Sequence, residues 1–275
     1  SVQPSVTDIT KAVSKYGNYM LLNEEVDVVN FTGQSDKLVE ILGINAGMSL
    51  NRLQRDEMED NATAILANGV AAVTDIVTKL ARNDIKKAVN TLNRNTASTF
   101  LPMTEGSDRV GTSPMRDSYW GICHSDVEED IRDMTGFIAV ESYASQTAVS
   151  PGEFGAVGGV RWLSTEESSI DLAAGGAIGA TGLRSVAGVK VDVYNSVVFG
   201  KDAVGSLGFG KEHIKEIYTA GDKLPSVQLI SKARGSAGAA DPLNELSTMG
   251  WKSWHGAKIL NGDWIRNIKS GATDL

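Results

Sequence analysis

A long helical pattern between residues 35 and 60 is the feature that most constrains the fold of this chain. In the segment SDKLVEILGINAGMSLNRLQRDEMEDN, seven residues fall on one stripe of an α-helix: Leu38, Ile41, Leu42, Asn45, Ala46, Ser49 and Leu53. Ser35 is a natural N-cap for this helix. About 25 helical residues span about 38 Å, which is long for a globular domain. The pattern therefore predicts a spine along which other elements pack.

The rest of the chain predicts a mixed α+β architecture. Residues 6–22 are rich in Val, Thr, Ile and Tyr and predict one or two strands, with Gly17 and Asn18 as a bend or bulge. Two shorter helices are expected, one over 83–95 that is capped by Asn83, and one over 125–134 that opens with a capping box of Ser125 and Glu128. Further strands are expected at 118–124, 155–165, 191–200, 213–219 and 226–233, and a glycine-rich surface loop at 171–188.

The C-terminal region predicts a β-hairpin that carries three of the five tryptophans. The stretches WKSWHGAKIL and DWIRNIK flank Asn261-Gly262, the preferred pair for a type I′ turn, because both turn positions need positive φ. Aromatic side chains of this size dominate core and interface energetics, so they indicate either a core beneath a small sheet or a subunit contact. The candidate packing or interface residues are Trp251, Trp254, Trp264, Tyr16 and Tyr19.

The charge and cysteine content exclude some classes of protein. The formal net charge is −8 with a sequence pI near 5.0, which disfavours a protein that wraps nucleic acid through Lys and Arg. Cys123 is the only cysteine, so no intrachain disulfide can form, and a reducing compartment fits. Its apolar neighbours predict a buried thiol. No apolar run approaches the roughly 18 residues of a membrane span.

The segment GSLGFGKE differs by one residue from a phosphate-binding P-loop. It supplies Gly205, Gly210 and Lys211, but Glu212 stands where a Ser or Thr hydroxyl would bind Mg²⁺. The following HIKEIYTAG favours a strand over the helix that a P-loop opens. We interpret the segment as a glycine turn, with a nucleotide site as the alternative.

Other motifs favour structural roles over chemical ones. The run GGAIGATG lacks the spacing of a dinucleotide-binding loop, and a flexible loop is the favoured interpretation. The polar cluster between His124 and Asp130 could suggest a metal, yet a solvated helix N-terminus explains it better. We therefore expect no catalytic, cofactor-binding or metal-binding set.

Three segments together resemble a known family. They are YWGICHSDVEEDIRDMTGFI (119–138), GEFGAVGGVRWLST (152–165) and GSAGAADPLNELSTMGWKSWHGAKILNGDWIRNI (235–268). They are similar to major coat proteins of tailed double-stranded DNA phages, of the N-four-like podophage coat family. The spacing of D-P-L-N, G-W-K and I-L-N in the last segment is the most specific part. The resemblance runs from about residue 7 to 268, and the loop at 171–188 does not match.

The resemblance implies the Hong Kong 97-type capsid fold, with a long spine helix, peripheral and axial domains and an extended loop called the E-loop. It implies an E-loop strand and the lead into the peripheral domain over 1–34, and the peripheral domain with the spine helix over 35–114. The axial domain would cover 115–240, and the C-terminal hairpin of 241–275 would return to the body of the subunit. In this family an arm and a first strand precede the segment that begins at Ser1, so we expect upstream residues that were cleaved, are disordered or were omitted.

The implied function is a major capsid protein without enzymatic activity or cofactor. Its copies would form hexamers and pentamers of an icosahedral shell that encloses double-stranded DNA and contacts it non-specifically. Cement or decoration, scaffold and portal proteins are further implied partners, with no membrane. The virion capsid is the implied location, after assembly in the cytoplasm of a host bacterium. The alternatives are an encapsulin-like protein compartment and a nucleotide-dependent or metal-dependent enzyme.

Overall fold

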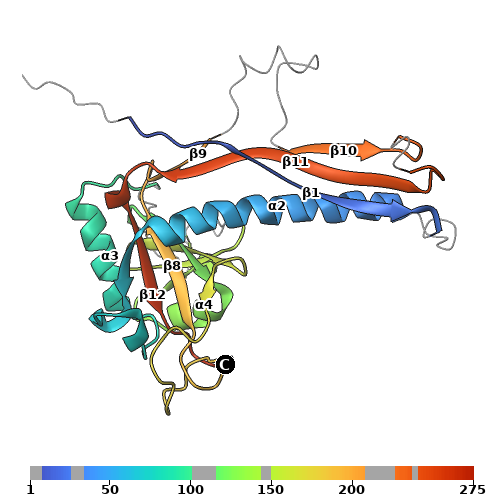
Figure 1. The fold of residues 1–275 in the computed structure, drawn as a ribbon. Helices are drawn as coiled ribbons and strands as arrows, with labels where there is room; N and C mark the ends of the chain where they lie inside the picture. Colours follow the sequence, from blue (N-terminus) through green and yellow to red (C-terminus); the bar gives the residue numbers. More distant parts are fainter. Residues whose placement is uncertain (1–7, 26–33, 101–115, 144–149, 208–226, 237–240) are drawn as a thin grey trace, which may run out of the picture. The chain divides into compact units, whose positions relative to one another are not determined.

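The computed structural model describes residues 8–25, 34–100, 116–143, 150–207, 227–236 and 241–275 (Figure 1). The chain divides into two compact units. Unit 1 consists of Ser1–Gln54 and Ser206–Lys258, and unit 2 consists of Arg55–Gly205 and Ile259–Leu275. Among the described helices, none is both long and apolar enough to cross a membrane.

Unit 1 is built from the long helix and an antiparallel sheet. The helix α2 spans Gln34–Asn61, which confirms the predicted spine, and its residues up to Gln54 belong to this unit. In the sheet, β11 (Leu246–Ile259) lies between β1 (Ser14–Asn23) and β10 (Val227–Lys232), and β9 (Val204–Leu207) also pairs with β11. Figure 1 shows α2 running along one face of these strands. The side chains of residues 34–36, the predicted cap Ser35 included, lie outside the described part.

The pairing of β1 with β11 corrects one prediction. The register runs without a shift from Ser14 opposite His255 to Asn23 opposite Leu246, so no bulge forms at Gly17 and Asn18. Gly17 has a different role, because a Cβ there would lie 2.6 Å from the carbonyl oxygen of Trp251. The glycine therefore allows close approach of the two backbones rather than a bend.

Unit 2 contains an eight-stranded mixed sheet. Its strand order is β2-β12-β8-β3-β6-β5-β4, and β7 pairs with β8. The pairs β2–β12 and β3–β6 are parallel, and the other pairs are antiparallel. The strands are β2 (Thr63–Leu66), β3 (Tyr119–His124), β4 (Ile138–Ala139), β5 (Glu153–Val157), β6 (Val160–Thr165), β7 (Ile170–Asp171), β8 (Val193–Phe199) and β12 (Ile265–Ser270). Short 3₁₀ segments are η1 (Ala67–Gly69), η2 (Val73–Asp75), η3 (Val140–Ser142) and η5 (Gly262–Trp264).

Two helices pack on this sheet and complete its core. The helix α3 (Arg82–Arg94) contacts β12 and β8, and α4 (Ser125–Arg132) contacts β3 and β6. The helix α3 supplies Ile85, Ala88 and Leu92, which are fully buried. The core continues through α4 and the strands with Cys123, Val127, Ile131, Trp162, Tyr194 and Ile268. The thiol of Cys123 is buried, as predicted.

The predicted caps of both helices are wrong. Ala81, not Asn83, precedes the first turn of α3, and its side chain makes no cap hydrogen bond. At α4 the cap is His124, whose Nδ1 accepts a hydrogen bond from the backbone N–H of Asp126 at 3.1 Å. Glu128 is bonded to Arg132 one turn later instead of reaching back to the cap. An imidazole has thus taken the role that the motif assigned to Ser125.

The predicted C-terminal hairpin does not form. Strand β11 pairs with β1 and β10, whereas β12 pairs with β8 and β2, so the two stretches belong to different sheets. Asn261 has a φ of −136° and caps the 3₁₀ segment η5 by accepting a hydrogen bond from Asp263, which excludes a type I′ turn. The Asn-Gly signal is local, and long-range strand pairing overrode it.

Candidate self-association surface

The inner face of the unit 1 sheet holds two of the five candidate aromatics. Trp251 is buried against Leu42 and Ala46 of α2, and Tyr16 packs on the same cluster. The indole Nε1 of Trp251 donates a hydrogen bond to Oδ1 of Asn45 at 3.0 Å. The indole therefore joins the sheet to the helix stripe that the sequence predicted.

The outer face of the same sheet is apolar and exposed. Cross-strand neighbours in an antiparallel sheet point to the same side, so the pairs Tyr19–Gly250 and Leu21–Thr248 face away from Trp251. Tyr19 is 71% exposed and Leu21 is 57% exposed. Two more residues on this side, Trp254 and Ile230, are 39% and 38% exposed. We call Tyr19, Leu21, Ile230 and Trp254 the outer sheet patch.

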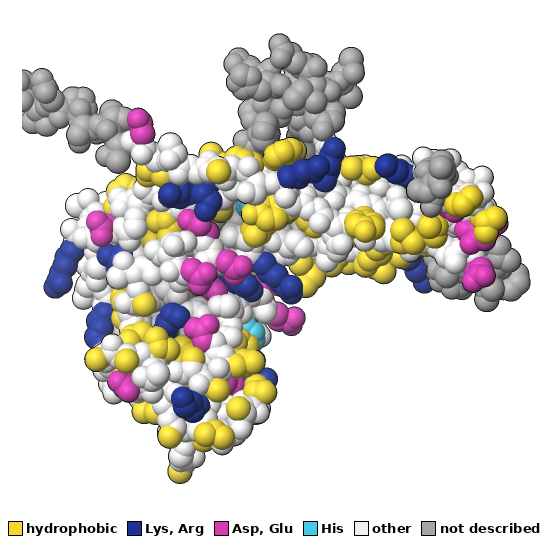
Figure 2. Space-filling view, viewed as in Figure 1, with side chains coloured by type: hydrophobic (Ala, Val, Ile, Leu, Met, Phe, Trp, Pro, Cys, Tyr) yellow, Lys and Arg dark blue, Asp and Glu magenta, His cyan; other side chains and the backbone are white. Residues whose placement is uncertain are grey.

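Basic side chains share this face with the outer sheet patch. Lys15 is opposite Trp254, Lys252 is opposite Gly17, and Lys232 is opposite Thr248. Strand alternation places all three lysines on the outer side. Figure 2 shows hydrophobic side chains, with Lys and Arg among them, at the surface of the unit that contains β11 and α2. The face combines apolar area with charged side chains, and an exposed apolar patch beside polar residues indicates a protein-interaction site.

The helix α2 also exposes an apolar stripe. Ile41, Ile44 and Met48 follow the i, i+3, i+7 spacing of one helix face and are 48%, 56% and 38% exposed. Gly43 and Gly47 lie between them, and nothing described lies within 4 Å of a Cβ built on either. A partner backbone could therefore approach this part of the helix closely.

Trp264 does not join the other two tryptophans. It belongs to unit 2, where it packs on the core and its Nε1 donates a hydrogen bond to the carbonyl of Asn95 at 3.0 Å. The aromatic cluster expected around one hairpin is therefore wrong: Trp251 and Trp254 lie on opposite faces of the unit 1 sheet, and Trp264 lies in unit 2. Which of these residues contact another subunit stays a prediction.

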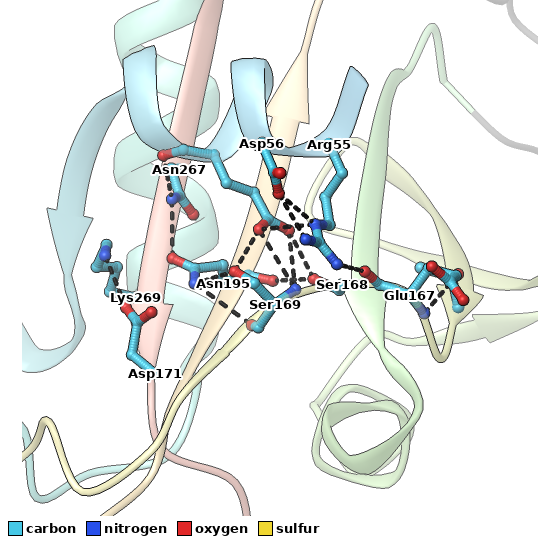
Figure 3. A network of polar contacts seen from close by, with 11 residues as sticks. Arg55, Asp56, Glu167, Ser168, Ser169, Asp171, Asn195, Asn267 and Lys269 are labelled. Carbon is cyan, nitrogen blue, oxygen red and sulfur yellow. Dashed lines mark hydrogen bonds and ion pairs between the residues drawn. The ribbon is translucent and has the colours of Figure 1, made fainter. Parts of the chain in front are cut away.

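A buried polar network surrounds the last turns of α2 within unit 2 (Figure 3). The carboxylate of Glu59 accepts hydrogen bonds from the hydroxyl of Ser168 at 2.9 Å and from the hydroxyl and backbone N–H of Ser169. The side-chain amide of Asn267 donates to the backbone carbonyl of Glu59 at 2.9 Å and to Oδ1 of Asn195. Burial raises the pKa of Glu59, although the serine hydrogen bonds and Arg55 oppose the shift. Because its oxygens are occupied, this carboxylate anchors the helix end and is not presented to a ligand.

The acidic side chains of the polar cluster at the start of α4 bond to different partners. Asp126 accepts a hydrogen bond from the Tyr194 hydroxyl at 2.8 Å and pairs with Arg184 at 3.1 Å. Asp130 pairs with Lys79 at 3.0 Å and accepts from Thr273. Within the described ranges, no group of three or more His, Cys, Asp or Glu side chains is placed to hold a metal ion.

Some glycines of the two glycine-rich motifs have packing roles, whereas nothing described lies within 4 Å of a Cβ built on Gly179 or Gly182. Gly205 lies in β9, whereas Gly210, Lys211 and Glu212 fall outside the described residues. In the run at 171–188, Gly175 is buried, and a Cβ there would lie 2.8 Å from the carbonyl oxygen of Ile76. This part of the predicted surface loop is therefore held in close backbone contact with the segment before α3.

Comparison with known proteins identifies the fold. No family model matches the sequence, and no curated protein matches it. Among solved structures, the capsid of Ralstonia phage GP4 aligns with a TM-score of 0.60 at 12% identity, covering 100% of this chain and 81% of that chain. The capsid of Helicobacter pylori bacteriophage KHP30 gives 0.55 at 9% identity, with 94% and 75% covered. The holo-SrpI encapsulin complex of Synechococcus elongatus PCC 7942 gives 0.52 at 7% identity, with 95% and 75% covered.

These similarities confirm the predicted fold class. The chain has the α+β fold of phage capsid proteins, the Hong Kong 97-type fold that the sequence resemblance implied. Ile41 lies on the predicted stripe but is exposed, because a helix stripe does not reveal which of its residues the sheet covers. Sequence reasoning did not single out Ile44 and Met48 as exposed apolar residues. The interpretation of GSLGFGKE as a glycine turn stays a prediction, because Gly210, Lys211 and Glu212 lie outside the described residues.

Proposed function

We propose that this chain is the major capsid protein of a tailed double-stranded DNA phage, in the N-four-like group. The observation that carries the proposal is the structural match to phage capsids over 94% or more of this chain and at least 75% of theirs. In this role the protein is a structural subunit, with no reaction of its own. Copies would assemble as hexamers and pentamers into a closed icosahedral shell.

The surface of unit 1 supports self-association. The outer sheet patch and the α2 stripe expose seven large apolar side chains: Tyr19, Leu21, Ile230, Trp254, Ile41, Ile44 and Met48. Each contact between copies can be weak, because a closed shell multiplies it over many subunits. An excess of acidic residues over the whole chain, at a net charge of −8, would let packaged DNA lie against the shell without tight binding.

The proposal is tested by the size and contents of purified particles. Sedimentation velocity over a range of salt and protein concentrations, with electron microscopy of the same samples, should show capsomers or closed shells. A stable monomer under every condition, also when co-expressed with scaffold and portal proteins of the source phage, would overturn it. Cement, scaffold and portal partners and assembly in the bacterial cytoplasm belong to the same proposal.

A second candidate is a protein compartment of the encapsulin type. The match to the SrpI encapsulin complex favours it, since its TM-score of 0.52 is close to those of the phage capsids. The contents of the shell distinguish the two functions. Nuclease-resistant double-stranded DNA inside the particles supports the capsid, whereas a co-purifying enzyme and no DNA supports the compartment.

A further inference from the structure

Unit 2 contains a cavity of about 1000 Å³ beside the helix α3. Three basic residues line it, Arg82 and Lys86 on successive turns of α3 and Arg116 before β3. The turn between β5 and β6 forms another wall through Gly158 and Gly159. Nothing in the proposed shell function uses this cavity.

Among the described residues, no ion pair neutralises the three basic side chains that line the cavity. None of the described residues forms an ion pair with Arg82, Lys86 or Arg116, whereas the adjacent Lys87 pairs with Asp84 at 3.2 Å. Like charges four residues apart on a helix destabilise it. The pair Arg82 and Lys86 therefore lacks the counter-charge that Lys87 has.

The Nε atom of the Arg82 guanidinium is buried, and none of the described residues accepts a hydrogen bond from it. Gly136, with a φ of +83°, leaves room for the group, since a Cβ there would lie 3.2 Å from Nη2 of Arg82. The buried Nε is closed to a ligand, so the anion would be bound through the Nη groups, by which a planar guanidinium is suited to bind two oxygens of one anion.

The lining indicates the kind of anion. Asp117 is the one acidic residue among the described lining residues, so the side chains carry a net charge of about +2 against the −1.5 to −2 of a phosphate group at neutral pH. A single carboxylate would leave about half of this charge unpaired. Val89 and Val157 add an apolar wall that an organic substituent could contact. We propose that this cavity binds a phosphate group, from inorganic phosphate or from a small phosphate monoester.

Isothermal titration of the purified protein with inorganic phosphate, and separately with phenyl phosphate, tests the proposal. We expect saturable binding of one ligand per subunit. Phosphate binding should become weaker by about tenfold or more in each of three variants, Arg82→Gln, Lys86→Gln and Arg116→Gln. Arg82→Lys should weaken binding by less, because lysine keeps the positive charge and loses only the two-pronged hydrogen bonding of the guanidinium. Lys190→Gln is the matched control, because it removes the same charge from an exposed residue that does not line the cavity. Tighter binding of phenyl phosphate would identify a monoester site, and tighter binding of inorganic phosphate a site for the free ion.

Two results would overturn the proposal. One is the absence of saturable binding of either ligand to the wild-type protein at concentrations up to about 10 mM, which is weaker than a specific site gives. The other is unchanged binding in the variant that combines all three substitutions, with circular dichroism showing that it remains folded. Neither result depends on shell assembly, because binding is measured per subunit in whichever form the protein purifies.

Discussion

The two units differ in how they treat apolar side chains. Among the described residues, unit 2 buries 27 hydrophobic residues and exposes 7 large ones, whereas unit 1 buries 4 and exposes 11. Unit 2 resembles an independent domain with its own hydrophobic core. The core of unit 1 is small: Leu42, Ala46 and Trp251 are buried, and Tyr16, Met20, Val227 and Met249 pack against them. The described residues thus indicate that unit 2 is stable through its own packing, and we propose that other copies of the chain cover the apolar surface of unit 1.

The two units also differ in net charge. Unit 1 contains 11 basic and 11 acidic residues, and unit 2 contains 15 basic and 23 acidic residues, so unit 2 carries the whole net charge of −8. The outer face of the unit 1 sheet presents lysines beside its apolar patch. Copies of this chain can therefore attract one another through unlike surfaces even though their net charges repel.

The largest expected effect is a loss of folding free energy on truncation of a core side chain in unit 2. Trp162 is fully buried there, so Trp162→Ala should lower the free energy of unfolding of the dissociated subunit by about 3–5 kcal/mol. Trp254→Ala in unit 1 should lower it by less than about 1 kcal/mol, because that side chain is 39% exposed. Urea unfolding followed by circular dichroism measures both. Equal losses in the two variants would contradict the contrast between the units.

The second prediction concerns assembly. Tyr19→Ser combined with Leu21→Ser should weaken subunit association by tenfold or more, about 1.4–3 kcal/mol, because it removes apolar area from the outer sheet patch. The stability of the dissociated subunit should change by less than about 0.5 kcal/mol per site, as for exposed residues generally. Sedimentation velocity measures the assembled fraction. The control is Leu172→Ser, which alters a residue of unit 2 that is 60% exposed; an equal loss there would assign association to both units.

The third prediction tests the pairing of β1 with β11. A Cβ at Gly250 would lie 2.9 Å from the carbonyl oxygen of Asn18 and 2.9 Å from Cβ of Tyr19, so Gly250→Ala should destabilise unit 1 by about 1–3 kcal/mol. Gly256→Ala is a matched change on the same strand, where the nearest atom would be 3.5 Å away. Hydrogen exchange of the β1 amides should accelerate in the first variant only. Similar exchange in both would show that this register is not maintained in solution.

The smallest expected effect is a pH dependence at Glu59. Burial raises the pKa of this carboxyl above its ordinary value of 4.5, so protonation stabilises the folded state relative to the unfolded state. The stability that Glu59 contributes should be greatest below pH 4.5 and decrease as pH rises through the folded pKa. Glu59→Gln should remove this slope. Unfolding free energies of the two proteins should therefore diverge as the pH rises from 4 to 7, and parallel curves would contradict the assignment.

Patterns within a single element predicted the fold well. The spine helix followed from its apolar stripe, and Leu42 and Ala46 of that stripe do form the core of unit 1. The helix α3 and the strands β3 and β8 followed from their own periodicity. Each of these depends on residues close together in the sequence, where period and burial are directly linked.

Predictions that needed long-range information were wrong or incomplete. Tyr16 and Tyr19 looked alike in sequence, but the register with β11 turns one inward and the other outward. The Asn-Gly turn was overridden because strands distant in sequence pair with each of its flanks. The cationic cavity was not predicted, because a sequence does not show that Arg82, Lys86 and Arg116 line one space.

The most direct test of the account is an electron cryomicroscopy reconstruction of purified particles at side-chain resolution. The account predicts a closed shell in which Tyr19, Leu21 and Trp254 of each subunit are buried against neighbouring copies, with most intersubunit apolar area supplied by unit 1. A shell in which these side chains face solvent and only unit 2 surfaces touch would contradict it. So would a protein that stays monomeric under every condition, also when co-expressed with scaffold and portal proteins, because the apolar surface of unit 1 would then need another explanation.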